Sequence, residues 1–380
     1  MADWLTARAA QARSWLFERA LPLWWERGFD RAGDCFHERI GLDGAPCRDL
    51  PRRIRVQARQ TLVYARAGAL GWPGPWREAV GSGARILCVR ACLPEGGTAH
   101  LLAPDGAVLD RRRDLYDLAF VILALAEAAR ALGGRDDLIA AAEAQLAWLE
   151  AHWSHPAGGF REGEVAPAPP RRQNPHMHLF EALLALHDAT GKAEHLARAG
   201  RLAALLVDRM VDAGANVLPE HFDDAWRPLE PRIIEPGHHF EWCCLLERWR
   251  RLGGGDLSDI GERLRQFAET HGVDLASGAV YDELAADGRP RARTSRLWPH
   301  SERIKANLAR FERTRDPAAA AAAAQAFDML MRYCDTPIPG LWRDRFDLAD
   351  GFVAEPAPAS SFYHIVLALE AWDRVARAPN

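Results

Sequence analysis

The stretch 235–245 of the sequence, EPGHHFEWCCL, places imidazole and carboxylate groups together at the start of an apolar segment. A Pro-Gly turn is followed by two histidines, and Glu241 comes three residues after His238. Positions three apart are neighbours on one face of a helix. A carboxylate beside an imidazole can accept its N–H, fix its tautomer and raise its basicity. The spacing therefore predicts a histidine that transfers protons, with Glu241 as its partner.

Polar and ionisable residues recur along the chain just before segments that become apolar. They are Gln57 and Arg59; Asp114, Tyr116 and Asp117; Asn174, His176, His178 and Glu181; Trp298, His300, Glu302 and Lys305; and Tyr363 and His364. His178, His238 and His364 fall on three separate segments at matching heights. Trp242 and Trp298 adjoin these positions, and aromatic faces beside convergent polar groups suit a sugar ring. We therefore expect these residues to meet in one polar pocket.

Other roles stay open for several of these residues. His176 and His239 also fit caps at helix starts, and Arg59 also fits an ion pair with a neighbouring helix. An isolated histidine such as His195 fits a surface or loop position. Three histidines and a glutamate could instead hold zinc, but no H-E-x-x-H motif supports that interpretation. No metal and no cofactor are predicted.

The segments that must position these side chains have helical periodicity. LYDLAFVILALAEAARAL (115–132), LIAAAEAQLAWLEAHW (138–153) and AAAAAAAQAFDMLMRYC (318–334) are amphipathic or buried helices. Six long connectors separate pairs of such segments, and they begin at Gly28, Gly96, Gly158, Gly214, Gly278 and Gly340. Shorter connections such as GWPGP and RLGGGD lie between them. The repeated unit is therefore a helical hairpin, present six times.

Six hairpins can form an open superhelix or a closed ring. An open array needs polar capping repeats at its ends, but the last segment, SSFYHIVLALEAWDRVA, is as apolar as the middle ones. We therefore expect an all-α fold, an (α/α)6 barrel with short β pieces in the long loops. Residues 1–380 are expected to form a single catalytic domain. The helices that follow the long loops should form the inner ring, with their N-termini on one face.

Composition and charge exclude several classes of function. The net charge is −4, with arginines spread among acidic residues, so no nucleic-acid partner is expected. The N-terminal stretch lacks the continuous apolar core of a signal peptide, and no run of about 18 uncharged apolar residues is present. Seven cysteines show no paired C-x-x-C spacing. We expect a cytoplasmic enzyme with reduced thiols and no membrane partner.

Five segments at inner-helix starts resemble the motifs of the N-acylglucosamine 2-epimerase superfamily, which consists of (α/α)6-barrel sugar epimerases and isomerases. They are QARQ around Arg59, NPHMHLFEALLAL around His178, PGHHFEW around His238, LWPHSE around Trp298 and FYHIVLAL around His364. The resemblance implies that His238 and His364 are the catalytic acid/base pair and that Glu241 is the partner of His238. It implies sugar contacts from Arg59, Asn174, His178, Trp298 and Glu302. Tyr116 and His176, at neighbouring helix starts, are added to the predicted substrate-binding residues.

Within the superfamily, the NPHMH and RLWP strings look most like the metal-independent mannose isomerases. That likeness implies interconversion of D-mannose and D-fructose by histidine-mediated proton transfer through a cis-enediolate. A 2-epimerase with the same two histidines is the alternative. A second alternative is a glycoside hydrolase, although that reaction would need a pair of carboxylates. A third alternative is a non-enzymatic repeat scaffold. The expected partner is a monosaccharide, and a homodimer is left open. His300 departs from the neutral amide of WPQ-like variants.

Overall fold

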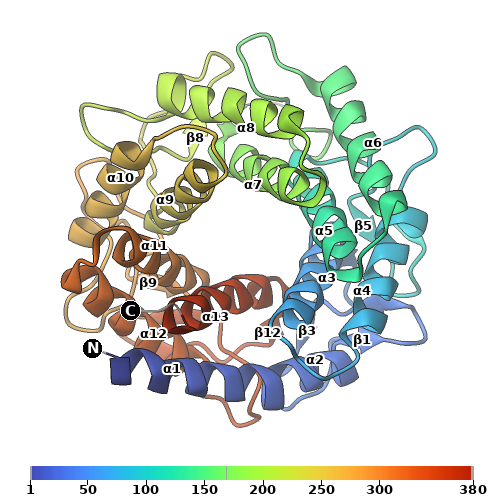
Figure 1. The fold of residues 1–380 in the computed structure, drawn as a ribbon, viewed down its shortest axis with the longest axis horizontal. Helices are drawn as coiled ribbons and strands as arrows, with labels where there is room; N and C mark the ends of the chain where they lie inside the picture. Colours follow the sequence, from blue (N-terminus) through green and yellow to red (C-terminus); the bar gives the residue numbers. More distant parts are fainter. Residues whose placement is uncertain (1, 168, 378–380) are drawn as a thin grey trace.

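The computed structural model describes residues 2–167 and 169–377, and these fold into two concentric rings of helices (Figure 1). The outer ring contains α1 (Ala2–Ser14), which continues through a π-helical turn (Trp15–Ala20) into α2 (Leu21–Arg27), then α4 (Trp76–Arg85), α6 (Asp136–Trp153), α8 (Ala193–Leu205), α10 (Ser258–His271) and α12 (Pro317–Tyr333). The inner ring contains α3 (Ile54–Ala69), α5 (Leu115–Leu132), α7 (Gln173–Thr190), α9 (Pro236–Arg251), α11 (Trp298–Thr314) and α13 (Phe362–Arg377). The helices that follow the long connectors are thus the inner ones, as expected.

The two rings differ in which faces of their helices are buried. In α5, every residue from 117 to 129 is buried, because the helix is packed between inner neighbours and an outer partner. The outer helix α6 instead buries Leu138, Ala142, Leu146 and Leu149, which recur every three or four residues. This spacing leaves its opposite face in water. The two apolar patterns in the sequence therefore correspond to the two layers of the barrel.

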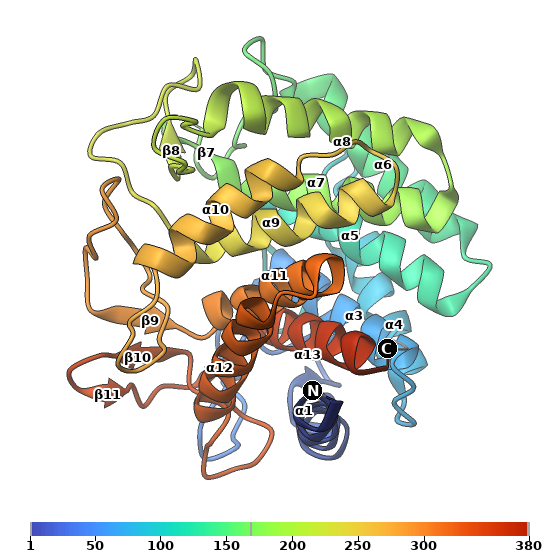
Figure 2. The ribbon, with the colours of Figure 1, turned by 60° about the vertical axis from the view of Figure 1, so that its left-hand side comes forward.

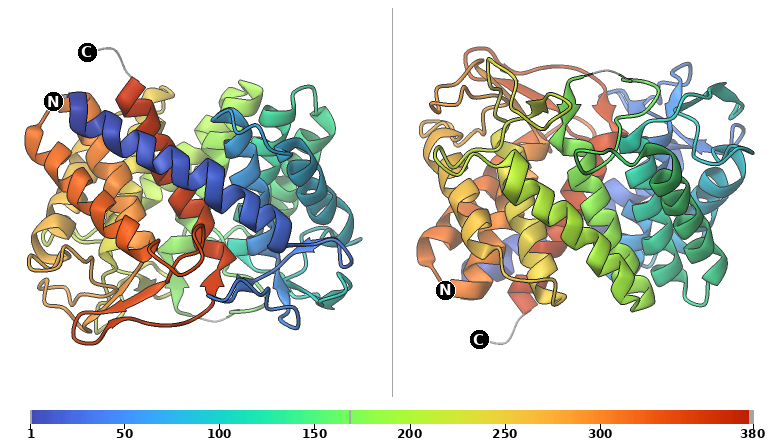
Figure 3. Two further views of the ribbon diagram at one scale, coloured as in Figure 1. Left: turned by 90° about the horizontal axis from the view of Figure 1, so that it is seen from below. Right: turned by 90° about the horizontal axis from the view of Figure 1, so that it is seen from above.

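The inner ring closes, so the superhelix alternative is wrong. Neighbouring inner helices contact one another in chain order, and α13 packs against α3. On the outside, α1 packs against α13, so the first and last helices of the chain are in contact (Figures 1 and 3). The indole N–H of Trp372 donates to the carbonyl oxygen of Leu5 at 3.1 Å. The ring of Trp342 stacks on Trp24 with centroids 4.7 Å apart. The predicted (α/α)6 barrel is confirmed.

Short antiparallel strands pair within and between the long loops at one end of the barrel (Figures 2 and 3). Within the described residues they are β1 (Phe29–Asp30) with β2 (Cys35–Phe36); β3 (Arg39–Ile40) with β12 (Ala357–Pro358); β4 (Arg52–Arg53), β5 (Leu101–Leu102) and β6 (Val108–Asp110); β7 (Arg171–Arg172) with β8 (His221–Phe222); and β9 (Thr294–Arg296), β10 (Arg345–Asp347) and β11 (Gly351–Phe352). Strands β4 and β7 run directly into inner helices α3 and α7. The pairing of these two strands therefore fixes where α3 and α7 begin.

Among the residues that the structure describes, none of the helices has both the length and the apolar composition that crossing a bilayer requires.

Candidate active site

A cavity of about 200 Å³ lies at the N-terminal ends of the inner helices. Eight of the predicted site residues line it, and they come from all six inner helices: Arg59, Tyr116, Asn174, His178, His238, Glu241, Trp298 and His364. Five further residues in its wall were not predicted: Glu235, Arg296, Asp344, Ser360 and Ser361. The structure therefore brings the predicted residues together, with the exceptions of His176 and Glu302.

His238 is paired with a carboxylate from the preceding loop. Its Nδ1 lies 2.8 Å from Oε1 of Glu220, while Oε2 of Glu220 accepts the side-chain N–H of Gln173 at 2.9 Å. Burial alone would favour the neutral ring, but Glu220 and Glu235 outweigh it and raise the pKa of His238 to about 9. His238 is therefore an imidazolium at neutral pH. The predicted pairing with Glu241 is wrong, because Glu220 occupies the Nδ1 side of the ring.

His364 is paired with a carboxylate from a neighbouring helix. Its Nδ1 lies 2.7 Å from Oε1 of Glu302, and Oε2 of Glu302 lies 2.6 Å from Nζ of Lys305. Burial, together with the positive charges of Arg59 and Lys305, lowers the pKa of His364 well below its usual value. This ring is therefore neutral at neutral pH. Glu302 is fully buried and does not line the cavity, so it contacts His364 instead of the predicted sugar.

Trp298 lies close to both imidazoles. Its ring centroid is 4.9 Å from that of His238 and 5.5 Å from that of His364. The two histidines thus line one cavity beside the same indole ring, and one of them is protonated while the other is neutral. A protonated and a neutral imidazole on the same small cavity can act as general acid and general base toward a single molecule.

Arg59 provides a fixed cation on the cavity wall. One Nη donates to the hydroxyl of Tyr116 at 2.6 Å and the other to the carbonyl oxygen of Ser360 at 3.1 Å. The guanidinium also lies 4.2 Å from the ring centroid of Phe120, a cation–π distance. These contacts hold the charge in place before any ligand arrives. A pre-positioned guanidinium can stabilise negative charge that develops on a sugar oxygen.

His178 and Glu241 complete the floor of the cavity. Nδ1 of His178 lies 3.2 Å from Glu181, whose carboxylate also accepts the hydroxyl of Tyr363 at 2.6 Å. Burial lowers the pKa of His178 to about 4. Glu241 is 1 % exposed, and neither of its oxygens has a hydrogen-bond partner among the described residues. Burial and the nearby charge of Glu302 raise the pKa of Glu241 well above its usual value, which favours its protonated form.

His176 does not reach the cavity. Its Nε2 accepts the backbone N–H of Phe160 at 3.0 Å, and its Nδ1 lies 3.0 Å from the carbonyl oxygen of Arg172. It is 1 % exposed and bonds the long loop to α7. The predicted sugar contact is therefore wrong, and the alternative of a structural histidine at the helix start is correct. Equivalent bonds are made to Phe36, Leu218 and Val280 by Gln57, His239 and His300. We call Gln57, His176, His239 and His300 the loop-anchoring residues.

The buried carboxylates raise the question of a metal. Glu241, Glu302 and His364 each bring a ligand-type atom to within 4.8 Å of the others. The Lys305 ammonium, however, already neutralises Glu302 at 2.6 Å, and it would repel a metal ion at this point. This donor set suits proton transfer better than metal binding.

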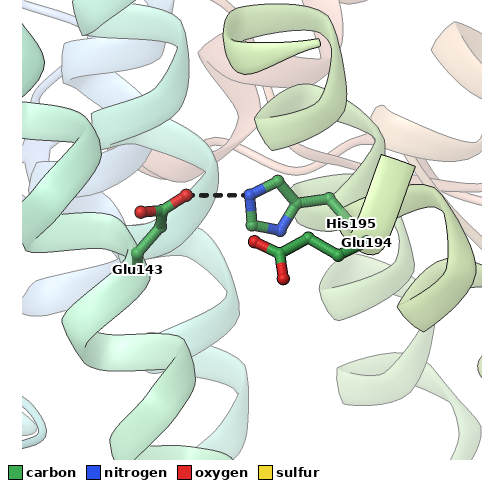
Figure 4. A group of neighbouring side chains, drawn as sticks. All are labelled: Glu143, Glu194 and His195. Carbon is green, nitrogen blue, oxygen red and sulfur yellow. Dashed lines mark hydrogen bonds and ion pairs between the residues drawn. The ribbon is translucent and has the colours of Figure 1, made fainter. Parts of the chain in front are cut away.

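A group of ligand-type side chains outside the cavity lies between α6 and α8, where Glu143 faces Glu194 and His195 (Figure 4). Nε2 of His195 lies 3.0 Å from Oε1 of Glu143, and the Lys192 ammonium lies 2.6 Å from the same oxygen. Arg198 likewise pairs with Glu194 at 3.2 Å. These cations neutralise the carboxylates, and the group links two outer helices. His195 is 1 % exposed within α8, so the expected surface or loop position is wrong.

The most important residue that the sequence analysis missed is Glu220. A signal for it exists in the repeated connectors. In the loops that begin at Gly158, Gly278 and Gly340, an acidic residue lies four positions after the glycine; Glu220 lies six after Gly214. These acids are Glu162, Asp282 and Asp344, and each bonds to the start of an inner helix, at Arg172, Arg296 and Ser361 respectively. An acidic residue early in the connector that begins at Gly214 therefore indicates Glu220 as a partner of an inner-helix residue.

Comparison with known proteins agrees with this geometry. Residues 35–368 match the model of the family described as N-acylglucosamine 2-epimerase (GlcNAc 2-epimerase). The chain is 40 % identical over 376 residues to a mannose-6-phosphate isomerase of Rhizobium meliloti (strain 1021), covering 95 % of this chain and 96 % of that protein. It is 31 % identical to a D-mannose isomerase of Thermobifida fusca, covering 90 % and 88 %.

Solved structures show the same fold. A crystal structure of D-mannose isomerase superposes with a TM-score of 0.87 at 22 % identity, covering 97 % of each chain. Cellobiose 2-epimerase from Bacillus thermoamylovorans B4167 superposes with a TM-score of 0.88 at 18 % identity, covering 97 % of this chain and 100 % of that one. Together with the family match, these likenesses show that the chain belongs to the N-acylglucosamine 2-epimerase family and is a sugar isomerase or epimerase.

Proposed function

We propose that this enzyme interconverts D-mannose and D-fructose by moving one proton between C2 and C1 of the open-chain sugar. The observation that carries this proposal is the pair His238 and His364, which line one cavity of about 200 Å³. The first is protonated and the second is neutral. The names of relatives that are 40 % and 31 % identical also support an isomerase acting on mannose or its phosphate.

The chemistry follows from these charge states. The C2 hydrogen of mannose becomes weakly acidic only while C1 is an open-chain carbonyl. His364, neutral and with Nδ1 bonded to Glu302, presents Nε2 as the base that removes this hydrogen. The electron pair moves through C1 to its oxygen and forms a cis-enediolate. Arg59 and the His238 imidazolium stabilise the negative charge. His238 exchanges protons with the oxygens, while the proton on His364 returns to C1.

The same site would support 2-epimerisation, which is the second candidate. His238 and His364 both lie beside Trp298, at centroid distances of 4.9 and 5.5 Å. If the enediolate turned between them, the His238 imidazolium would protonate C2 from the face opposite to His364, and glucose would form from mannose. The outcome depends on how freely the intermediate rotates in the cavity.

The proposed substrate is the free sugar and not its 6-phosphate. Glu235 and Asp344 both line the cavity, and the neighbouring Arg296 is already bonded to Glu235 at 2.9 Å. A phosphate dianion there would meet two carboxyl groups beside a guanidinium that is already in use. Comparison of turnover with mannose and with mannose 6-phosphate at equal concentration tests this point. Faster turnover of the phosphate would contradict it.

Three further properties belong to the proposal. Residues 1–380 act as one catalytic domain, because all six inner helices contribute to the cavity. Turnover needs no metal, because the Lys305 ammonium already neutralises Glu302 and the His238 imidazolium already neutralises Glu220. The enzyme works in a reducing cytoplasm, because its seven cysteines are unpaired thiols.

The decisive experiment is incubation of the protein with D-mannose in D2O, with and without a chelator, followed by NMR of the products. Fructose formed equally in both samples, with deuterium at C1 when the base exchanges with solvent, is the expected result. Glucose without fructose would move the assignment to a 2-epimerase. Loss of turnover on chelation would contradict metal independence, and no conversion at all would refute the proposal.

A further inference from the structure

Lysine is rare in this chain, and one of its lysines is buried below the active site. Lys192 and Lys305 are the only two lysines in the sequence, in which 48 residues are lysine or arginine. The side chain of Lys192 is 46 % exposed on the outer wall, whereas that of Lys305 is 8 % exposed on the inner helix α11. A buried ammonium needs a specific partner to compensate for its lost hydration. The position of Lys305 therefore calls for an explanation.

Lys305 is bonded to the carboxylate that orients His364. Its Nζ lies 2.6 Å from Oε2 of Glu302, and the other oxygen of Glu302 lies 2.7 Å from Nδ1 of His364. Lys305 and Glu302 are three residues apart on α11, so their contact requires no other element. The result is a continuous chain of ammonium, carboxylate and imidazole that ends at the cavity. Lys305 itself does not line the cavity.

The surroundings of Lys305 contain more carboxyl groups than can all be ionised. Glu181 on α7 and Glu241 on α9 lie near Glu302, and all three are almost fully buried. Glu181 has its own donors, His178 and the hydroxyl of Tyr363. The other groups that act on Lys305 or His364 are Cys244 on α9 and Arg59 on α3.

Which of these carboxyl groups carries charge depends on the ammonium. Burial and the neighbouring Glu181 raise the pKa of Glu302, and Lys305 is the strongest influence in the opposite direction. Two buried carboxyl groups close together cannot both ionise easily, so one of them keeps its proton. The ammonium touches Glu302 and not Glu241, and it therefore directs the negative charge to Glu302.

We propose that Lys305 is a positioning residue that keeps Glu302 ionised and so holds His364 in the tautomer with its proton on Nδ1. A carboxylate can only accept a hydrogen bond, so Nδ1 must donate and Nε2 is left free to act as the base. A protonated Glu302 could instead donate to Nδ1, which would place the ring proton on Nε2 and remove the base. This inference rests on the proposed role of His364.

The first test replaces each lysine with methionine, an unbranched residue of similar length. Lys305→Met is expected to lower kcat by about 10²-fold, the usual contribution of a general base, with KM little changed because Lys305 lies outside the cavity. Lys192→Met is the matched control and should keep wild-type kcat. Lys305→Arg retains the charge and should recover most of the lost rate. Wild-type kcat in Lys305→Met would overturn the proposal.

The second test separates a charge effect from a folding defect. In the Glu302→Gln background, Lys305→Met should cause little additional loss of kcat, because the carboxylate on which Lys305 acts is gone. A loss that multiplies with that of Glu302→Gln would instead indicate a general structural role and would overturn the proposal.

The third test does not depend on turnover of any sugar. NMR of 15N-histidine-labelled protein distinguishes a protonated from an unprotonated ring nitrogen, and His364→Gln identifies the relevant signals. We expect protonated Nδ1 and free Nε2 in the wild type, and the reverse in Lys305→Met. An unchanged tautomer would overturn the proposal even if the wild type isomerises mannose. The tautomer change in a protein that converts no sugar would refute the proposed function alone.

Discussion

At the scale of single residues, the partners of two histidines decide that one is protonated and the other is neutral. His238 has Glu220 at 2.8 Å and Glu235 at 3.9 Å, and this negative surrounding holds its proton. His364 is bonded to the carboxylate of Glu302, but Lys305 neutralises that carboxylate and Arg59 adds positive charge nearby. In the proposed mechanism, the net charge around each ring thus decides which histidine is the acid and which is the base.

Removing either imidazole should therefore remove one half of the proton transfer. His238→Ala and His364→Ala are each expected to lower kcat by roughly 10²–10⁴-fold, the usual range for a general acid or base. Initial rates of sugar conversion measure this, and thermal unfolding of each variant checks that the fold is retained. Full activity in a folded variant would reject the role of that histidine.

Glu220 should control the alkaline limit of activity. The pKa of His238 is raised to about 9, so its imidazolium is present at neutral pH and is lost as the pH rises through about 9. In Glu220→Gln a major cause of this shift is gone, and the loss of kcat/KM should move to lower pH, toward the ordinary histidine value of about 6.5.

The pH dependence of kcat/KM in both proteins measures this shift. Glu18→Gln, at an exposed position of the outer wall, is the control and should leave the profile unchanged. An identical alkaline limb in Glu220→Gln would show that His238 is not the group that loses its proton.

At the scale of elements, hydrogen bonds hold four of the long loops to the inner helices that follow them. Gln57, His176, His239 and His300 each accept a backbone N–H from the loop, at distances of 2.7 to 3.1 Å. The histidines can accept this bond only while the accepting nitrogen is unprotonated. Burial lowers the pKa of His176 and His300 to about 3 and that of His239 to about 4.

Acid should therefore destabilise the fold through these histidines. An unfolded histidine gains a proton below about pH 6.5, whereas the buried His176 does not until about pH 3. Stability is fully present above pH 6.5 and falls as the pH decreases through this window. At pH 5 the loss is about 2 kcal/mol for each such histidine.

The chain itself suggests the variant for this test, because Gln57 makes the same bond without titrating. His176→Gln should show a smaller decrease in the free energy of unfolding between pH 7 and pH 5 than the wild type. Urea unfolding at both pH values measures this, and His271→Gln, at an exposed position, is the control. An equal decrease in His176→Gln and wild type would contradict the assignment.

At the scale of the whole molecule, the ends of the chain must meet for the cavity to exist. His364 lies on the last inner helix, and Arg59 on the first, and both line the same cavity. The contact of α13 with α3 and the stacking of Trp342 on Trp24 connect the last hairpin to the first. An open array of the same hairpins would leave these two side chains far apart.

Trp342 is accordingly expected to matter for global stability. It is fully buried, and its ring lies 4.7 Å from that of Trp24. Trp342→Ala should lower the free energy of unfolding by about 3–5 kcal/mol, the usual cost of removing a buried large aromatic ring. Chemical denaturation measures this, with Leu275→Ala as the control because Leu275 is 88 % exposed. A change of less than about 1 kcal/mol would contradict the importance of this junction.

Local patterns in the chain predicted much of this protein. Apolar periodicity and the spacing of the connectors identified the six hairpins, and the polar residues at inner-helix starts identified eight cavity-lining side chains, including His238 and His364. These features depend on residues close together in the chain, so the sequence carries them directly. His176 and His178 are two residues apart on one helix, but only His178 lines the cavity, because His176 is bonded to the preceding loop. The sequence did not show where that loop lies.

Partnership between distant groups was decided only by the tertiary structure. Glu220 reaches His238 from 18 residues away in a loop, and Glu302 reaches His364 from 62 residues away on another helix. Whether a carboxylate orients an imidazole or binds a sugar depends on which segments the closed barrel brings within hydrogen-bond distance. The sequence therefore determined which groups surround the cavity, while the packing of the rings determined which of them share a proton.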